Sequence, residues 1–220
     1  MIHRTWVEID ERALTHNIMA LKGLLSDGAT FCAVVKANAY GHGIVEVARI
    51  AARCGVKAFA VDNIDEALVL RAMLPSSLIL VLGYTLKDRY ADALKNAIHL
   101  TVYTREQVTA LEFAATEHAE TAFIHLKIET GTSRQGILPD QLYELLDVVG
   151  ASAHVALVGV SMHFANIEDT EDSSYANHQF ALFQECVAAI RAAGFQPEWT
   201  HCANSAGTIL YPDTHGTLVR

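Results

Sequence analysis

The sequence predicts an α/β protein of the TIM-type (β/α)8-barrel class, because eight short apolar runs alternate with longer amphipathic segments along its 220 residues. The runs are apolar on both faces, as buried parallel strands are. They cover residues 31–35, 58–61, 78–82, 100–102, 122–128, 155–162, 198–201 and 218–220. An open doubly wound sheet is the structural alternative, but no GxGxxG motif follows the first run, which favours the barrel.

The segments between these runs carry helix signals. Residues 44–53 repeat apolar side chains at helical spacing, and residues 180–193 form a longer amphipathic stretch. Ser, Thr, Asn and Pro favour helix starts, a Glu or Gln three residues later completes a capping box, and Gly favours helix ends. Residues of these kinds stand at the expected places: Asn63 with Glu66, Thr104 with Gln107, Pro139, and Gly194.

Composition limits the classes of function. Hydrophobic residues make up 51% of the chain and charged residues 19%, which favours a buried core over disorder. The net charge is −9 and no long basic run occurs, so no nucleic-acid partner is expected. The chain starts without a secretory signal, and its apolar runs are too short to cross a bilayer. The four cysteines are scattered and form no CxxC pair, which is typical of reduced thiols in a cytoplasmic protein. We therefore expect a cytoplasmic protein without a membrane partner.

Both ends of the chain depart from a complete barrel. Residues 6–10 look like an extra strand, and we expect residues 1–10 to join a C-terminal β domain that these 220 residues do not include. Residues 11–220 would then form the barrel. The chain stops at Arg220, inside or just after the eighth strand, so the barrel is expected to lack its last helix. We therefore expect this stretch alone to be inactive.

Polar residues gather where the predicted strands end, which is where active sites lie in this class of barrel. Lys36 ends the first strand, and partial burial there favours the neutral amine that a Schiff base with an aldehyde requires. Taken alone, Lys36 could equally extend to solvent. Other polar residues lie at or just after the ends of the later strands. They are Lys127 and Arg134 for the fifth strand, His163 for the sixth, His201, Asn204 and Ser205 for the seventh, and Arg220 for the eighth.

Several of these residues also have ordinary structural explanations. Tyr40 could lie at the edge of the core, and Ser205 could cap a helix. His163 could be a core histidine, while Arg134 and Lys127 could be surface charges of little energetic weight. Their joint occurrence in this order favours a site over these separate explanations.

Residues 33–43 read Ala-Val-Val-Lys-Ala-Asn-Ala-Tyr-Gly-His-Gly and closely resemble the pyridoxal-phosphate motif of alanine racemases. The resemblance continues in the segments 6–10, 125–136, 162–165, 201–207 and 219–220. The chain is thus identified as the N-terminal barrel domain of this fold-type III family. The resemblance implies pyridoxal 5'-phosphate as cofactor and interconversion of L-alanine and D-alanine, which supplies D-alanine for cell-wall peptidoglycan.

The resemblance also implies roles for the candidate residues. Lys36 holds the cofactor as a Schiff base and is one of two acid–base groups. Arg134 contacts the substrate carboxylate, and carbamylated Lys127 orients Arg134. The other residues surround the cofactor: Tyr40 and Ser205 at the phosphate with Asn204 beside them, His163 against the ring, and Arg220 at the pyridine nitrogen with His201 behind it. The second acid–base group is a tyrosine from the partner subunit of a homodimer.

Three alternatives remain open. Lys127, His163 and His201 could imitate a metal-dependent amidohydrolase, although that site also needs His-x-His on the first strand, where this chain has Val-Val-Lys. A single barrel could also carry pyridoxal phosphate without catalysis. A racemase for serine or for many amino acids is the third. Glu129 and the residues beside Arg134 depart from the family's usual aspartate, methionine and leucine, which leaves the substrate open.

Overall fold

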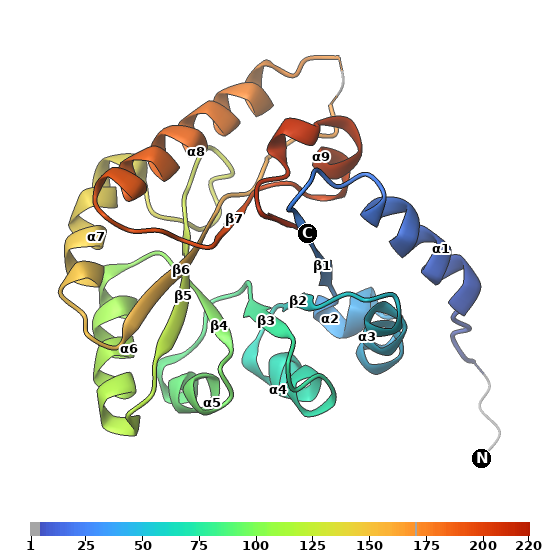
Figure 1. Ribbon diagram of the computed structural model, residues 1–220, viewed down its shortest axis with the longest axis horizontal. Coiled ribbons are helices and arrows are strands. Elements are labelled where there is room, and N and C mark those ends of the chain that lie inside the picture. Colours follow the sequence, from blue (N-terminus) through green and yellow to red (C-terminus); the bar gives the residue numbers. More distant parts are fainter. Residues whose placement is uncertain (1–4, 170) are drawn as a thin grey trace.

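The eight predicted strands form one parallel sheet that curls into a nearly closed barrel with helices around its outside (Figure 1). The computed structural model describes residues 5–169 and 171–220. Every predicted strand is confirmed, with ends that differ by one residue or none. The strands are β1 (Thr30–Val34), β2 (Ala58–Val61), β3 (Leu78–Val81), β4 (His99–Val102), β5 (Ala122–Lys127), β6 (Val155–Ser161), β7 (Trp199–His201) and β8 (Leu218–Val219).

The sheet order β7-β6-β5-β4-β3-β2-β1-β8 places the last strand beside the first. The remaining seam, between β7 and β8, is bridged by backbone hydrogen bonds near both ends. Thr217 N donates to Thr200 O at 3.0 Å, and Arg220 N donates to Ala203 O at 3.2 Å. The second bond draws Arg220 against the segment that follows β7, at the same end of the barrel as the other strand ends.

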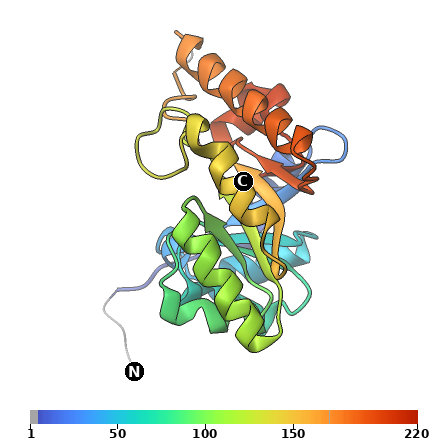
Figure 2. The same ribbon diagram turned by 90° about the vertical axis from the view of Figure 1, so that its left-hand side faces the viewer.

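The helices lie outside the sheet, and α6 and α7 cover the outer face of β5 and β6 (Figure 2). The predicted capping box of Thr104 and Gln107 is present at the start of α6. No helix among the described residues is both long and apolar enough to pass through a membrane. The helices are α1 (Glu11–Lys22), α2 (Lys36–Tyr40), α3 (Ile44–Arg53), α4 (Ile64–Met73), α5 (Tyr90–Lys95), α6 (Arg105–His118), α7 (Leu142–Gly150), α8 (Ser174–Ala192) and α9 (Ser205–Leu210), with 3₁₀ turns η1 (Lys87–Arg89), η2 (Pro139–Gln141) and η3 (Pro212–Thr214).

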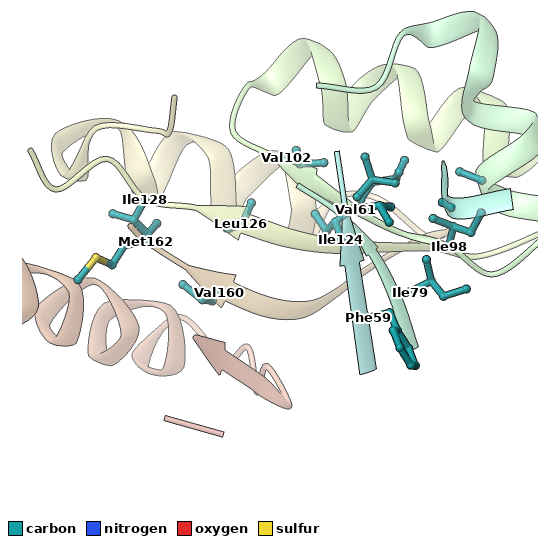
Figure 3. Packing of buried hydrophobic residues seen from close by; sticks show 14 of the residues in the cluster. Phe59, Val61, Ile79, Ile98, Val102, Ile124, Leu126, Ile128, Val160 and Met162 are labelled. Atoms are coloured by element: carbon teal, nitrogen blue, oxygen red, sulfur yellow. The ribbon is translucent and has the colours of Figure 1, made fainter. Parts of the chain in front are cut away.

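The main apolar core lies between the sheet and the helices. Phe59, Ile79, Ile124, Leu126 and Val160 are fully buried in it (Figure 3). Side chains at alternating positions point into the barrel instead, where the apolar cluster is small and consists of Cys32, Ala58, Ala60, Leu80 and Leu218. The opposite wall of the interior carries the buried polar side chains Thr101, His125, Lys127, Ser161 and His201. The barrel therefore holds polar groups in a protected space.

Residues 6–10 do not form the expected strand in this structure. Residues 5–10 have no regular structure, and Trp6 is 70% exposed. A strand requires a neighbouring strand for its hydrogen bonds, and no such neighbour lies beside this segment in residues 5–169 and 171–220. Residues 1–4 lie outside the described residues. Assignment of residues 1–10 to the sheet of a further domain stays a prediction.

Helix α8 begins at Ser174, whereas the predicted start is residue 180. The added turns contain mostly polar residues, so the apolar periodicity does not reveal them. Gln179 in these turns is fully buried and hydrogen-bonds Ala165 N at 3.0 Å and Thr130 Oγ1 at 3.4 Å. A buried polar side chain that is satisfied by hydrogen bonds takes a core position without an apolar signal. Gly194 follows the helix as predicted, with φ +94°.

Candidate active site

One cavity of about 630 Å³ joins the carboxyl ends of the strands to the interior of the barrel. Eight of the nine predicted site residues line it: Lys36, Tyr40, Lys127, Arg134, His163, Asn204, Ser205 and Arg220. The ninth, His201, lies behind Arg220 and accepts a hydrogen bond from it, Arg220 Nε to His201 Nδ1, at 2.9 Å. The structure therefore brings all the predicted site residues together at one place.

Lys36 stands directly after β1 and begins a turn of unusual conformation. The residues Ala37, Asn38, Ala39 and Tyr40 have φ values of +51°, +54°, +52° and +55°, so α2 is largely a left-handed turn. Each such residue costs roughly 1–2 kcal/mol relative to the right-handed form, except where Asn relieves it. Because the turn is so tight, it returns Tyr40 to the cavity that Lys36 lines.

Hydrogen bonds hold this left-handed turn in place. Asn38 N donates to Glu66 Oε1 at 2.9 Å, and Asn38 Oδ1 accepts from Ile44 N at 2.9 Å. Glu66 Oε2 accepts from Asp62 N at 3.1 Å. Only half of the predicted capping box at Asn63 is therefore formed: Asn63 accepts from Glu66 N at 3.0 Å, but the Glu66 carboxylate is used to tie the segments after β1 and β2 to α4.

Lys127 ends β5 as a buried side chain close to two arginines. Burial, followed by the positive charges of Arg220 and Arg134, holds the pKa of Lys127 well below its usual range. Among the described residues, Lys127 forms no salt bridge or side-chain hydrogen bond. Burial without a counter-ion favours the neutral, nucleophilic form of an amine. Because Lys127 is only 5% exposed, its interpretation as a surface charge is wrong.

Arg134 lies on an exposed loop after β5 that Glu129 organises. The Glu129 carboxylate accepts from Gly131 N at 2.6 Å and from Arg134 N at 3.2 Å. Burial raises the pKa of Glu129, but these amides and their neighbours in the loop outweigh it and lower the pKa overall. Gln135 Nε2 donates to Leu82 O at 3.0 Å and fastens the loop to β3. Glu129 and Gln135, two of the three departures from the family pattern, therefore support the loop that carries Arg134.

His163 follows β6 and is partly buried at the wall of the cavity. Burial, followed by the charge of Arg220, lowers the pKa of His163 to about 3. The ring is therefore neutral, and its Nδ1 is buried without a hydrogen-bond partner among the described residues. A buried unpaired polar atom is costly, so His163 differs from an ordinary satisfied core histidine.

Asn204 and Ser205 stand at the start of α9. Asn204 Oδ1 accepts from Gly207 N at 2.9 Å, and Asn204 Nδ2 donates to Glu168 Oε1 at 2.8 Å. The helix cap is therefore Asn204, and the alternative role of Ser205 as the cap is wrong. Ser205 is exposed and lines the cavity, where its hydroxyl can bind a ligand.

Arg220 is held at the closing seam of the barrel with its charge toward the cavity. Besides its bond to His201, it donates from a terminal nitrogen to Met162 O at 2.5 Å. Burial lowers the pKa of Arg220, but a guanidinium starts so high that it remains protonated and acts only as a donor. The site therefore presents a fixed donor to whatever fills the cavity.

The fold and the site together define a (β/α)8 barrel whose working face is formed by the carboxyl ends of the strands, with a lysine at the end of β1. The chain belongs to the family described as the N-terminal domain of alanine racemase, whose family model matches residues 9–220. This confirms the membership that the motifs indicated.

Individual relatives agree with this assignment. An alanine racemase from Desulfovibrio desulfuricans is 38% identical over 215 residues, which cover 98% of this chain and 58% of the relative. One from Listeria monocytogenes is 40% identical over 221 residues, which cover 99% and 58%. The solved alanine racemase from Clostridium difficile 630 in complex with cycloserine has a TM-score of 0.95 at 32% identity and covers 100% of this chain and 60% of its own. The chain thus spans less than two thirds of the length of these relatives.

Sequence reasoning missed four residues that support the site. Glu66 has a predicted role only in a helix cap, and Gln179 lies just before the predicted helix of residues 180–193. His125 and His99 received no role, although His125 lies two residues before Lys127 and therefore on the same face of β5. The alternation of side chains along a strand therefore places His125 on the same side of the sheet as Lys127, and this was the signal in the sequence that could have identified it. The contacts of Glu66, Gln179 and His99 appear only in the folded chain.

Proposed function

We propose that the protein containing this chain interconverts L-alanine and D-alanine with pyridoxal 5'-phosphate attached at Lys36. The observation that carries the proposal is the convergence of Lys36, Tyr40, His163, Ser205 and Arg220 on one cavity. Among the related structures, an alanine racemase from Bacillus anthracis, 33% identical with a TM-score of 0.93, is described with bound L-Ala-P. We extend that binding of an alanine derivative to this chain as part of the proposal.

The residues present fit this cofactor. Lys36 offers an amine to its aldehyde, and the hydroxyls of Tyr40 and Ser205 offer hydrogen bonds to its phosphate, with Asn204 beside them. The neutral ring of His163, whose Nδ1 lacks a partner, can pack against an aromatic ring. Arg220 is a donor without acceptor capacity, so it binds a pyridine nitrogen in its unprotonated form.

When bound, pyridoxal phosphate supplies an electron sink for the negative charge left on the α-carbon after proton removal. Lys36 Nζ then holds or moves the proton on one face of that carbon. Arg134 binds the substrate carboxylate and orients the α-hydrogen. The second face requires another acid–base group, which we propose is a tyrosine from the partner subunit of a homodimer.

We further propose that Lys127 is carbamylated. Its neutral Nζ would add to carbon dioxide, forming an N–C bond and releasing one proton, which leaves a carbamate of negative charge. The negative charge that the carbamate adds beside Arg134 and Arg220 would attract both guanidinium groups, and the carbamate oxygens would accept hydrogen bonds from Arg134. The lowered pKa of Lys127 and the lack of a salt bridge to it among the described residues support this step.

The metal-hydrolase alternative is disfavoured by the hydrogen bonds of His201. One ring nitrogen of His201 contacts His125 at 2.8 Å and the other accepts from Arg220 at 2.9 Å. Neither ring nitrogen of His201 is therefore free to bind a metal ion. A carrier of pyridoxal phosphate without catalysis has no evident use for Arg134 or for the buried Lys127.

The proposed attachment is tested by borohydride reduction of the protein after incubation with pyridoxal phosphate. We expect a pyridoxyl group on the peptide that contains Lys36 and none in Lys36→Ala, while Lys57→Ala serves as the matched surface control. Labelling of a different lysine in the unaltered protein would overturn the proposal. Rates of D-alanine and D-serine formation, compared as kcat/KM in the protein with its complete chain, decide the substrate.

The cellular part of the proposal has its own test. Cells depleted of the protein are expected to require added D-alanine for growth, because peptidoglycan synthesis would lack it. Growth without D-alanine after depletion, in cells that hold no second source of it, would contradict that role.

A further inference from the structure

A continuous row of three histidines runs through the barrel to Arg220. His99 Nδ1 lies 3.0 Å from His125 Nε2, and His125 Nδ1 lies 2.8 Å from His201 Nε2. Arg220 Nε completes the row with its 2.9 Å bond to His201 Nδ1. His125 and His201 are 0% and 1% exposed, while His99, at the first position of β4, is partly exposed. The row thus connects the amino end of β4 with the cavity.

The direction of every hydrogen bond in this row follows from Arg220. A guanidinium can only donate, so His201 Nδ1 must accept, and neutral His201 carries its proton on Nε2. That proton is donated to His125 Nδ1, which places the proton of neutral His125 on Nε2. His125 Nε2 in turn donates to His99 Nδ1. All three rings are therefore fixed as the Nε2–H tautomer by one charged group at the end of the row.

Each ring of the row is neutral. Burial, then His99 and Arg220, hold the pKa of His125 well below its usual range, and burial, then Arg220, do the same for His201. Burial, followed by the charge of Arg71, lowers the pKa of His99 to about 4. A neutral imidazole has one donor and one acceptor, which is what the inner positions of such a row require.

The backbone is shaped around the central ring. Gly159 on β6 faces His125, and a Cβ at position 159 would collide with the His125 ring. The β5–β6 pairing shifts register between Ile124 and His125, which sets His125 opposite Gly159. His99 is stacked on Phe123 with ring centroids 5.2 Å apart and an interplanar angle of 25°. These features hold the rings of His125 and His99 independently of the cavity.

We propose that His125 and His99 are positioning residues for Arg220, which they serve by holding His201 in the tautomer that accepts from the guanidinium. Without the acceptor of His125, the buried Nε2–H of His201 is unpaired. His201 then relieves this cost by moving its proton to Nδ1, where it opposes Arg220 Nε–H and displaces the guanidinium. The consequence for the cofactor rests on the proposed function, whereas the order of tautomers is a property of the chain alone.

The tautomers are read directly by long-range ¹H–¹⁵N correlation NMR of the protein with ¹⁵N-labelled histidine, without cofactor, at pH 7. We expect neutral Nε2–H rings for His99, His125 and His201. His215 is an internal reference, because Ser26 N donates to its Nδ1 at 3.0 Å and Thr208 O lies 3.0 Å from its Nε2. A charged ring, or an Nδ1–H ring at His201 in the unaltered protein, would overturn the proposal.

Variants separate positioning from packing. His125→Leu should move the His201 signal away from the pure Nε2–H form, whereas His125→Asn, whose Oδ1 can stand in for Nδ1, should restore it. His178→Gln, at an exposed position of α8, is the control and should change none of the three signals. If His125→Leu does not fold, His99→Leu tests the same idea through the signal of His125. An unchanged His201 signal in folded His125→Leu, or an unchanged His125 signal in His99→Leu, refutes the row as a positioning device.

The cofactor-loaded protein gives a second readout. We expect His125→Leu to lower kcat by roughly ten-fold to hundred-fold, the range seen when outer hydrogen-bond partners of a site are removed, to leave KM less changed, and to shift the visible absorbance of the bound cofactor. His125→Asn should recover most of kcat. If no cofactor binds at Lys36, the proposed function fails while the NMR result for the tautomers stands. If the tautomers differ from those expected, the proposal that His125 and His99 position Arg220 is refuted, whether or not the cofactor binds.

Discussion

The carboxylate of Glu66 accepts a hydrogen bond from the backbone N–H of Asn38 at 2.9 Å, and through it α4 holds the left-handed turn between Lys36 and Tyr40. The other carboxylate oxygen of Glu66 accepts from Asp62 N at 3.1 Å. One side chain thus fixes the segments after two neighbouring strands. Among the described residues, Lys36 and Tyr40 form no such hydrogen bond with α4, so α4 acts on the turn through Glu66.

We predict that Glu66→Ala weakens both stability and cofactor binding. Hydrogen bonds to a charged group contribute about 1.5–3 kcal/mol each, and partial exposure places this pair at the lower end. We expect a loss of about 2 kcal/mol in urea unfolding and a pyridoxal-phosphate Kd that rises about ten-fold, the change that 1.4 kcal/mol produces. Glu66→Gln, which keeps one acceptor, should fall between. Glu117→Gln, at an exposed site on α6, is the control; a Kd unaltered in Glu66→Ala would show that α4 does not position the turn.

The left-handed turn also predicts that an alanine-to-glycine substitution within it does not lower stability, in contrast to the same substitution in a right-handed helix. Ala37 has φ +51°, a conformation that costs an L-residue roughly 1–2 kcal/mol and glycine nothing. Ala37→Gly should therefore leave stability equal or higher by up to about 1 kcal/mol. Ala114→Gly, inside right-handed α6, should lower stability by about 1 kcal/mol. Urea unfolding of the two variants checks the sign, and an equal loss in both would mean that Ala37 is not strained.

Most of the barrel could be predicted because its strands are buried on both faces and their apolar runs end sharply. The polar helix start at Ser174 could not, since Gln179 is buried through hydrogen bonds rather than through apolar character. The strand expected at residues 6–10 depends on a partner strand, which a local pattern cannot supply.

The candidate site was predicted through strand ends and motif resemblance, but its supporting contacts were not. The left-handed turn gives little local signal, because Ala37 and Ala39 favour right-handed helix in other settings. His125 and His201 are 76 residues apart in sequence and meet only when the barrel closes. The role of Gly159 also appears only in the folded barrel, because the His125 ring occupies the space that a side chain at position 159 would need.

Carbamylation of Lys127 predicts a labelled product. Protein incubated with ¹³C-bicarbonate near neutral pH should show one carbamate signal in its ¹³C NMR spectrum, because the lowered pKa of Lys127 leaves its amine free to react. The signal should be absent in Lys127→Ala and retained in Lys36→Ala. A carbamate that persists in Lys127→Ala would assign the modification to another lysine. Loss of the carbamate should also weaken alanine binding, measured as KM, because Arg134 loses its negative neighbour.

The buried neutral histidines predict that stability falls as the solution becomes acidic. The pKa of His99 is lowered from 6.5 to about 4 and that of His163 to about 3. Between these values and 6.5 the unfolded chain binds more protons than the folded chain, so the free energy of unfolding rises with pH there and is fully present above about 6.5. At about 1.4 kcal/mol per pKa unit, His99 alone should cost roughly 2 kcal/mol on passing from pH 7.5 to pH 5.

Urea unfolding at these two pH values measures the effect. His99→Leu is expected to reduce the difference between them by roughly 2 kcal/mol, because the titrating ring is gone. His178→Gln, at its exposed position on α8, should keep the full difference. If His99→Leu and the unaltered protein lose the same stability at pH 5, then His99 is not held neutral by burial, and the end of the histidine row is open to protons. That outcome would also predict a loss of the His125 tautomer below pH 6, which the ¹⁵N spectra would show independently.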